Sequence, residues 1–263
     1  MMQRLLAPLR HRELLFELAR SDFRARHKGS LLGALWAFAQ PVLTIVLYLF
    51  IYLVGLRRAE TDGVPFVLWL IVGITPWFFF TDALSSMTQS LVEYKFLVKK
   101  VVFEVTIIPA IKLLSSSFVA LVVWAVMLLV LMANGYPPRL AWLQIPYFYF
   151  AIVALVTGLG LMTSAITPFF RDLSQVVAVC MQFGVWLTPV LWPLSNAPAR
   201  FVPFLQLNPV LYVIQGLREA LLHGKPFWNH PALTLYFWVF VGVVNLLGLR
   251  IFGRLRPHLA DVL

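Results

Sequence analysis

GSLLGALWAFAQPVLTIVLYLFIYLVGL, residues 29–56, contains 28 residues and no charged side chain. Lys28 precedes this stretch and Arg57 follows it. A helix of about 20 predominantly apolar residues spans the hydrocarbon core of a bilayer. The stretch therefore predicts a membrane-spanning helix.

Five further charge-free runs follow, at residues 63–81, 113–138, 140–170, 173–199 and 226–249. The chain is 61% hydrophobic and 12% charged, with a mean hydropathy of +0.86, whereas about a quarter of the residues in soluble domains are charged. These patterns predict an all-α integral membrane protein, in which residues 1–263 form one domain. The expected transmembrane helices cover residues 29–56, 63–81, 106–133, 141–166, 173–193 and 232–251.

The positions of the basic residues predict the orientation of the chain. Fifteen of the 21 Lys and Arg residues fall in the two terminal segments, between the second and third spans, or between the fourth and fifth. Positive charge near helix ends favours the cytoplasmic side. We therefore expect both termini to be cytoplasmic.

Two segments leave alternatives open on the outer and inner sides. The charge-free run 201–217 is long enough for a seventh span, but Pro203 and Pro209 interrupt it and remove backbone donors that lipid cannot replace. We therefore expect short re-entrant helices on the outer side at residues 194–231.

Residues 82–105 mix charged and apolar side chains and predict a cytoplasmic helix that docks on a separate subunit. The alternative is a helix-end continuation packed on its own bundle.

The N-terminal segment, residues 1–28, has an apolar helical face that includes Leu14, Leu15 and Leu18. This pattern predicts a helix lying in the membrane interface, and the alternative is a solvated basic leader. The net charge of +10 is distributed among membrane edges, which argues against a nucleic-acid partner.

Several function classes lack their residues in this sequence. The six charge-free runs contain no ionisable group except His230 at one margin, which disfavours proton or sodium coupling. No HExxH, GxSxG or GxxxxGK[ST] motif is present, so we expect no enzyme activity, metal or bound cofactor in this chain. A membrane pore without its own energy source suggests a separate motor subunit.

An ordered set of motifs resembles the membrane subunits of ABC-2 type exporters, particularly the permeases for O-antigen, capsule and teichoic-acid polysaccharides. The set covers nearly the whole chain, and Glu104 departs from it where family members often have Pro. The motifs are Arg24, Arg26, Lys28, Gly29, Ser30, Leu32, Gly33, Leu35, Trp36 and Pro41; LVKKVVF at 97–103 with Pro109; FFRDL at 169–173; TPVLWP at 188–193; and LNPVLYVIQGLREALLHGKP at 207–226.

This resemblance implies a homodimer of permeases in the bacterial inner membrane, surrounded by membrane lipids. It also implies two ABC ATPase subunits that bind ATP and Mg, and a polyprenyl-diphosphate-linked glycan as substrate. Within this chain it implies an N-terminal interface helix, a coupling helix and outer gating helices. The alternatives are an exporter of small lipophilic compounds and a non-transport lipid scramblase or scaffold.

Four groups of candidate site residues follow, each with an alternative in packing or membrane anchoring. We expect aromatic side chains of the sugar path at Trp36, Phe38, Tyr48, Trp77, Phe78 and Trp186. Lipid-diphosphate binding is expected at Arg24, Arg26 and Lys28, because Arg matches phosphate oxygens. Coupling to the ATPase is expected at Glu93, Tyr94, Lys95, Lys99 and Lys100. An outer gate is expected at Asn208, Pro209, Tyr212, Gln215 and Arg218.

Overall fold

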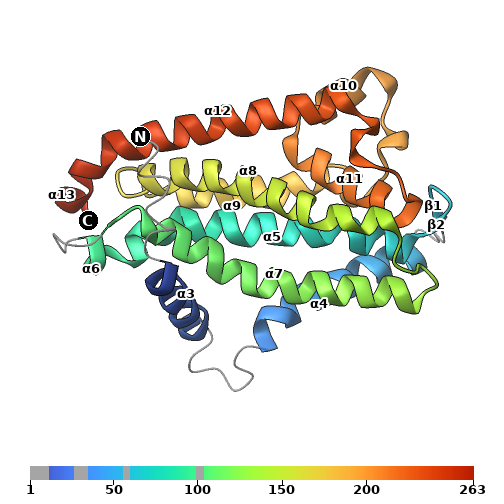
Figure 1. Ribbon diagram of the computed structural model, residues 1–263, viewed down its shortest axis with the longest axis horizontal. Coiled ribbons are helices and arrows are strands. Elements are labelled where there is room, and N and C mark those ends of the chain that lie inside the picture. The colour runs from blue at the N-terminus through green and yellow to red at the C-terminus, as the bar shows by residue number, and fades with distance from the viewer. Residues whose placement is uncertain (1–11, 27–34, 56–59, 99–103) are drawn as a thin grey trace.

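The computed structural model describes residues 12–26, 35–55, 60–98 and 104–263. It shows an elongated bundle whose long helices run side by side (Figure 1), which confirms the all-α prediction. The only strands in the described ranges are β1 (Glu60–Thr61) and β2 (Val64–Pro65). They form one antiparallel pair in which Thr61 lies opposite Val64.

Five helical segments in the described ranges are long and apolar enough to cross a membrane. Three of them combine an α-helix with a shorter helical segment of another type. They are α4 (Trp36–Leu49) with the π-helix η2 (Phe50–Gly55), α5 (Phe66–Glu93), α7 (Ile107–Ala133), the 3-10 helix η3 (Leu140–Gln144) with α8 (Ile145–Ile166), and α12 (Pro231–Leu255) with the 3-10 helix η7 (Arg256–His258).

The structure differs from the expected six spans at α9 (Leu173–Leu187), which has 15 residues. At 1.5 Å per residue this helix is about 22 Å long, shorter than the hydrocarbon core of about 30 Å. The expected span reached residue 193, but the backbone of Thr188 is extended and Pro189 follows. The residue before a proline is disfavoured in the helical region, so the helix ends there.

The segment after the second span also differs from its predicted boundary. Helix α5 continues from Phe66 to Glu93, and only the four-residue α6 (Lys95–Val98) follows it. Ala83, Leu84, Met87 and Leu91 are buried and share one face of α5, so packing extends the helix past Asp82. Residues 82–93 thus match the alternative of a helix-end continuation on the same bundle.

Helix α3 (Arg12–Arg26) lies at the same end of the bundle as α6 and α13 (Leu259–Val262) (Figure 1). Its Ala19 packs with Ile107 and Ile111 of α7. The predicted interfacial helix therefore has one face docked on the bundle. We call this end of the molecule the α3 end.

The opposite end, here called the α11 end, contains short helices in the region predicted to be re-entrant. They are η4 (Leu194–Asn196), η5 (Ala199–Phe201), α10 (Val202–Gln206), α11 (Pro209–His223) and η6 (Phe227–Asn229). The run 201–217 is not one helix, because α10 ends at Gln206 and α11 begins at Pro209. The structure thus contains no seventh span in this run.

The central helix of the bundle is α5, because 72% of its most apolar 18-residue stretch is buried. In the segment that contains α4, 6% of the corresponding stretch is buried. Helices α7, α8 and α11 all contact α5. The helices α8 and α12 approach closely at two glycines: a Cβ on Gly248 would lie 2.5 Å from the carbonyl oxygen of Gly158. The nearly uncovered α4 leaves a long apolar surface for lipid or another subunit.

Candidate functional site

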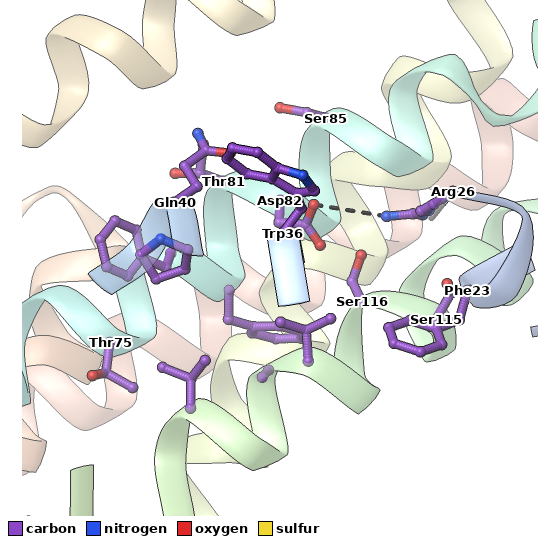
Figure 2. Close-up of a pocket in the computed structure, with 16 residues that line it drawn as sticks. Phe23, Arg26, Trp36, Gln40, Thr75, Thr81, Asp82, Ser85, Ser115 and Ser116 are labelled. Atoms are coloured by element: carbon purple, nitrogen blue, oxygen red, sulfur yellow. Dashed lines mark ion pairs between the residues drawn. The ribbon is translucent and has the colours of Figure 1, made fainter. Parts of the chain in front are cut away.

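A pocket of ≈ 540 Å³ lies between α3, α4, α5 and α7, and we call it the α3–α4 pocket (Figure 2). Its volume lies in the range of typical small-molecule sites, about 300–1,000 Å³. Its aromatic lining consists of Phe23, Trp36, Phe78 and Phe79. Its polar uncharged lining consists of Gln40, Thr75, Thr81, Ser85, Ser115 and Ser116.

Hydroxyl groups make the pocket polar without making it strongly charged. The hydroxyl of Thr75 donates to the carbonyl oxygen of Ile71 in its own helix at 2.7 Å. The hydroxyls of Thr81 and Ser116 are buried without a hydrogen-bond partner among the described residues. Buried polar groups in folded proteins are nearly always hydrogen-bonded, so these two hydroxyls at the pocket wall lack the partner that is normally present.

The charged groups of the pocket lie where α3 meets α5. Figure 2 shows Arg26 pointing from α3 toward Asp82 of α5, and the two form an ion pair of 3.7 Å. Nε of Arg26 also donates to Oδ2 of Asp22 at 2.9 Å. Arg26 is therefore shared between two carboxylates.

Behind the pocket lies a group of charged and hydrogen-bonded side chains that we call the ion-pair cluster: Asp22, Arg26, Glu93, Tyr94 and Lys112. Within this cluster Asp22 and Lys112 are buried, whereas Glu93 is exposed. Nζ of Lys112 lies 2.6 Å from Oδ1 of Asp22 and 2.5 Å from Oε2 of Glu93. The hydroxyl of Tyr94 donates to the same Asp22 oxygen at 2.8 Å. The cluster joins α3 to the start of α7 and to the end of α5.

Opposing effects set the pKa of Asp22. Burial raises the pKa of this carboxyl, whereas the hydrogen bond from Lys112 and the charge of Arg26 lower it, and the balance leaves the pKa below its usual value. The pKa of Tyr94 is raised by burial and by its hydrogen bond to Asp22. Asp22 is therefore a carboxylate at neutral pH, and Tyr94 is its neutral donor.

Sequence reasoning did not single out Asp22 or Lys112. Lys112 is 3% exposed and lies near the start of α7, inside the predicted span 106–133. The signal in the sequence was that Lys112 is the only charged residue between Glu104 and Arg139. A lone lysine in an apolar helix needs a partner, but the pattern alone does not say which segment supplies it.

The expected aromatic path residues do not form one group. Trp36 and Phe78 line the α3–α4 pocket, whereas Tyr48 and Trp186 contact each other edge to face, with ring centroids 6.2 Å apart. Trp77 is 5% exposed and lies against Gly184, so it belongs to the core in this structure. Phe38 is half-buried on α4 and does not line the pocket.

The expected phosphate-binding residues differ from one another in their contacts, and so do the expected coupling residues. Arg24 is exposed and has no ion pair within the described ranges, unlike Arg26. Glu93 and Tyr94 face the bundle through the ion-pair cluster, while Lys95 is exposed on α6. Lys28, Lys99 and Lys100 lie outside the described residues.

Asn208 and Pro209 begin α11 at the α11 end. The side chain of Asn208 accepts a hydrogen bond from the backbone of Val210 at 3.0 Å and donates to the Thr188 hydroxyl at 2.7 Å. An N-cap asparagine followed by a proline at the first helical position favours a helix start. The start of α11 is thus fixed to the end of α9.

Arg218 is fully enclosed at the α11 end. Its guanidinium donates to the carbonyl oxygens of Trp69, Pro189 and Val190 at 3.3, 2.9 and 2.6 Å, and its centre lies 3.4 Å from the centroid of the Trp69 ring. A Cβ on Gly73 would lie 2.0 Å from Nη2 of Arg218. The predicted gate residue therefore connects α11, α5 and the irregular backbone after α9.

Together these features describe a helical membrane protein with a polar pocket at the α3 end and an irregular cap at the α11 end. The sequence model of the ABC-2 type transporter family matches residues 13–222. The chain belongs to this family and is the membrane subunit of a transporter.

Individual relatives match almost from end to end. The chain is 28% identical over 252 residues to the O-antigen export system permease protein RfbA of Klebsiella pneumoniae, covering 95% of both proteins. It is 29% identical over 228 residues to the protein of the same name from Myxococcus xanthus, covering 86% of both. It is 25% identical over 237 residues to the polysialic acid transport protein KpsM of Escherichia coli, covering 88% of this chain and 89% of the relative.

Proposed function

We propose that this chain is the permease of an ATP-driven exporter that moves a polyprenyl-diphosphate-linked polysaccharide out of the bacterial cytoplasm. The observation that carries the proposal is the near end-to-end similarity to O-antigen and polysialic acid export proteins. Two such permeases and two ABC ATPase subunits, which bind ATP and Mg, form the exporter in the inner membrane. Both termini are then cytoplasmic, and the α3 end is the cytoplasmic end.

The α3–α4 pocket suits the first sugars of such a substrate. The buried hydroxyls of Thr81 and Ser116 at its wall have no partner among the described residues, and a bound sugar that displaces the wall slightly would exchange hydrogen bonds with them, since each hydroxyl both donates and accepts. The rings of Trp36 and Phe78 supply flat apolar contact. A weakly charged surface offers many shallow contacts and no deep electrostatic minimum that would hold a moving polymer.

The diphosphate requires a separate binding step at the edge of the pocket. Arg26 is the arginine that lines the pocket, and Asp22 and Asp82 already engage it. A diphosphate that approaches Arg26 must replace Asp82, whose ion pair at 3.7 Å is the longer of the two. Exposed Arg24, two residues earlier on α3, is free to make the first contact.

Two apolar surfaces support the homodimer. Helix α4 is almost uncovered, and Phe183, Trp186 and Leu187 on α9 are exposed. A second copy that packs on these surfaces would bury them and would enclose a path between the subunits. The exposed Lys95 and Phe96 of α6 are then available to the ATPase.

The test is to delete the gene and to restore it by plasmid, with surface polysaccharide and cytoplasmic glycan measured in parallel. We expect loss of surface polymer and accumulation of intracellular glycan, both reversed by the wild-type chain. In the purified protein, we expect a bound ABC ATPase whose ATP turnover rises when lipid-linked glycan is added. Detergent micelles that contain no undecaprenyl diphosphate should not raise this turnover. Unchanged surface polysaccharide in the deletion strain, or turnover stimulated only by small lipophilic compounds, would exclude the proposal.

A further inference from the structure

A second pocket, of ≈ 240 Å³, lies at the α11 end between α10, α11, η6 and α12, and we call it the α11–α12 pocket. It shares no lining residue with the α3–α4 pocket. Two of the predicted gate residues, Tyr212 and Gln215, line it, whereas Asn208 and Arg218 do not. The pocket is smaller than the sites that hold drug-sized ligands, about 300–1,000 Å³, so it suits a ligand of about one ring.

The polar lining consists of neutral amides and one acid–histidine pair. The side-chain amides of Gln206 and Gln215 are half-buried and make no hydrogen bond to any described residue. Oε1 of Glu219 lies 3.2 Å from Nε2 of His230. No Lys or Arg is among the residues that line the pocket, so the site lacks the cations that a phosphate or carboxylate would require.

The aromatic rings of the pocket are held in fixed orientations. The hydroxyl of Tyr212 is hydrogen-bonded to the hydroxyls of Tyr147 at 2.7 Å and Thr234 at 3.0 Å. The hydroxyl of Tyr236 donates to the carbonyl oxygen of Leu207 at 2.7 Å. Both tyrosine hydroxyls thus have partners within the protein, and the ring of Tyr212 stacks on Phe237 with centroids 4.6 Å apart. The amides are therefore the groups left to recognise polar groups of a ligand.

We propose that the α11–α12 pocket binds one uncharged pyranose unit of the exported polysaccharide as the chain leaves the permease. This inference rests on the proposed function and adds a second sugar site, at the opposite end of the bundle. A pyranose has an apolar C–H face for the rings and a rim of hydroxyls. Each hydroxyl donates and accepts, which matches an amide that offers both an oxygen acceptor and N–H donors.

The direct test measures binding of D-glucose, D-galactose, D-mannose and N-acetyl-D-glucosamine to the purified permease–ATPase complex in nanodiscs by saturation-transfer NMR. We expect at least one of these sugars to bind, and Gln206→Leu and Gln215→Leu each to weaken binding about fivefold, as expected for one lost neutral hydrogen bond. Leu233→Trp, which fills the pocket without removing a polar group, should also weaken binding. Gln175→Leu, at an exposed position on α9, is the matched control.

Substitution of Gln206 or Gln215 removes no hydrogen bond between described residues, so we expect each variant to keep the wild-type melting temperature. Weaker sugar binding in at least one pocket variant, with the control unchanged, supports the proposal. The proposal is overturned if none of the four sugars binds the wild-type complex, or if every pocket variant binds like the control.

The source of the sugar is decided in cells and in nanodiscs that contain galactosyl diacylglycerol. Slower polymer export by Gln215→Leu than by Gln175→Leu assigns the site to the exported chain. Displacement of free sugar by the glycolipid, with equal export by both variants, overturns that assignment. Export by the wild-type chain is measured in the same cells: its absence refutes the proposed function, whereas normal export in all pocket variants refutes this inference alone.

Discussion

Replacement of Lys112 by methionine is the sharpest test of the ion-pair cluster. Methionine keeps much of the apolar stem of lysine but removes the charge that lies 2.6 Å from Asp22 and 2.5 Å from Glu93. Asp22 is 4% exposed, so its carboxylate would stay buried and would keep Arg26 and Tyr94 as hydrogen-bonded partners. Breaking a buried ion pair on one side costs about 3–5 kcal/mol, and the two retained partners place the expected loss near 3 kcal/mol.

The assay is a double-mutant cycle with Lys112→Met, Asp22→Asn and the combined variant, in detergent-solubilised protein. The free energy of unfolding is measured by denaturant titration, and hydrogen exchange of the α3 amides reports whether this helix detaches. The double variant should lose less stability than the two single variants together, with a coupling of about 1–3 kcal/mol. Lys95→Met, on the exposed side of α6, is the matched control and should change little.

The cluster also predicts how the loss depends on pH. In the wild type the pKa of Asp22 lies below its usual value, so the carboxylate stabilises the fold above pH about 4 and this contribution is lost as the pH falls through the folded pKa. Removal of Lys112 takes away the largest effect that lowers the pKa of Asp22 and leaves the opposing effect of burial, so we expect this pKa to rise. The deficit of Lys112→Met should then be complete at pH 7 and should shrink as the pH falls toward about 4.

Stability losses near 0.5 kcal/mol or less for both single variants, or strictly additive losses, would refute this account of the cluster. A deficit of Lys112→Met that stays constant between pH 7 and pH 4 would show that burial of the Asp22 charge is not its cause.

Two further predictions concern the pocket and the α11 end. Gly73→Ala should lower the free energy of unfolding by about 1–3 kcal/mol, because the added Cβ would lie 2.0 Å from Arg218. The control Gly242→Ala has no atom within 4 Å of its Cβ and should be neutral or stabilising. Equal melting temperatures of the two variants would contradict this prediction. Phe78→Ala should reduce polysaccharide export at normal protein abundance, because Phe78 lines the α3–α4 pocket. Trp77→Ala should reduce protein abundance, because Trp77 is a core residue. The reverse pattern in export and immunoblot assays would contradict the assignment.

The spans were predictable because their signal is local. Each charge-free run lies within one stretch of sequence, so it can be recognised without knowing its neighbours. The predicted length is wrong at α9, where Pro189 ends the helix before the apolar run ends, and at α5, which continues past Asp82 to Glu93. The prolines at 203 and 209 correctly indicated that residues 201–217 do not form one helix.

The candidate site was only partly predictable, because aromatic residue type does not reveal which face of a helix is covered. Trp77 and Phe78 are adjacent in the sequence, yet one packs in the core and the other lines the α3–α4 pocket. The direction of each ring depends on how α5 is rotated against α4 and α7. That rotation is set by packing of the whole bundle.

The sequence by itself determined that this chain lies in a membrane, because a charge in the hydrocarbon core costs several kcal/mol and the long runs without charge are visible in one dimension. Only the tertiary structure decided what the buried charges do. Lys112 meets Asp22 across 90 positions and Arg218 meets the backbone of Trp69 across 149. Buried charges require partners at hydrogen-bond distance, and here folding brings those partners from distant segments.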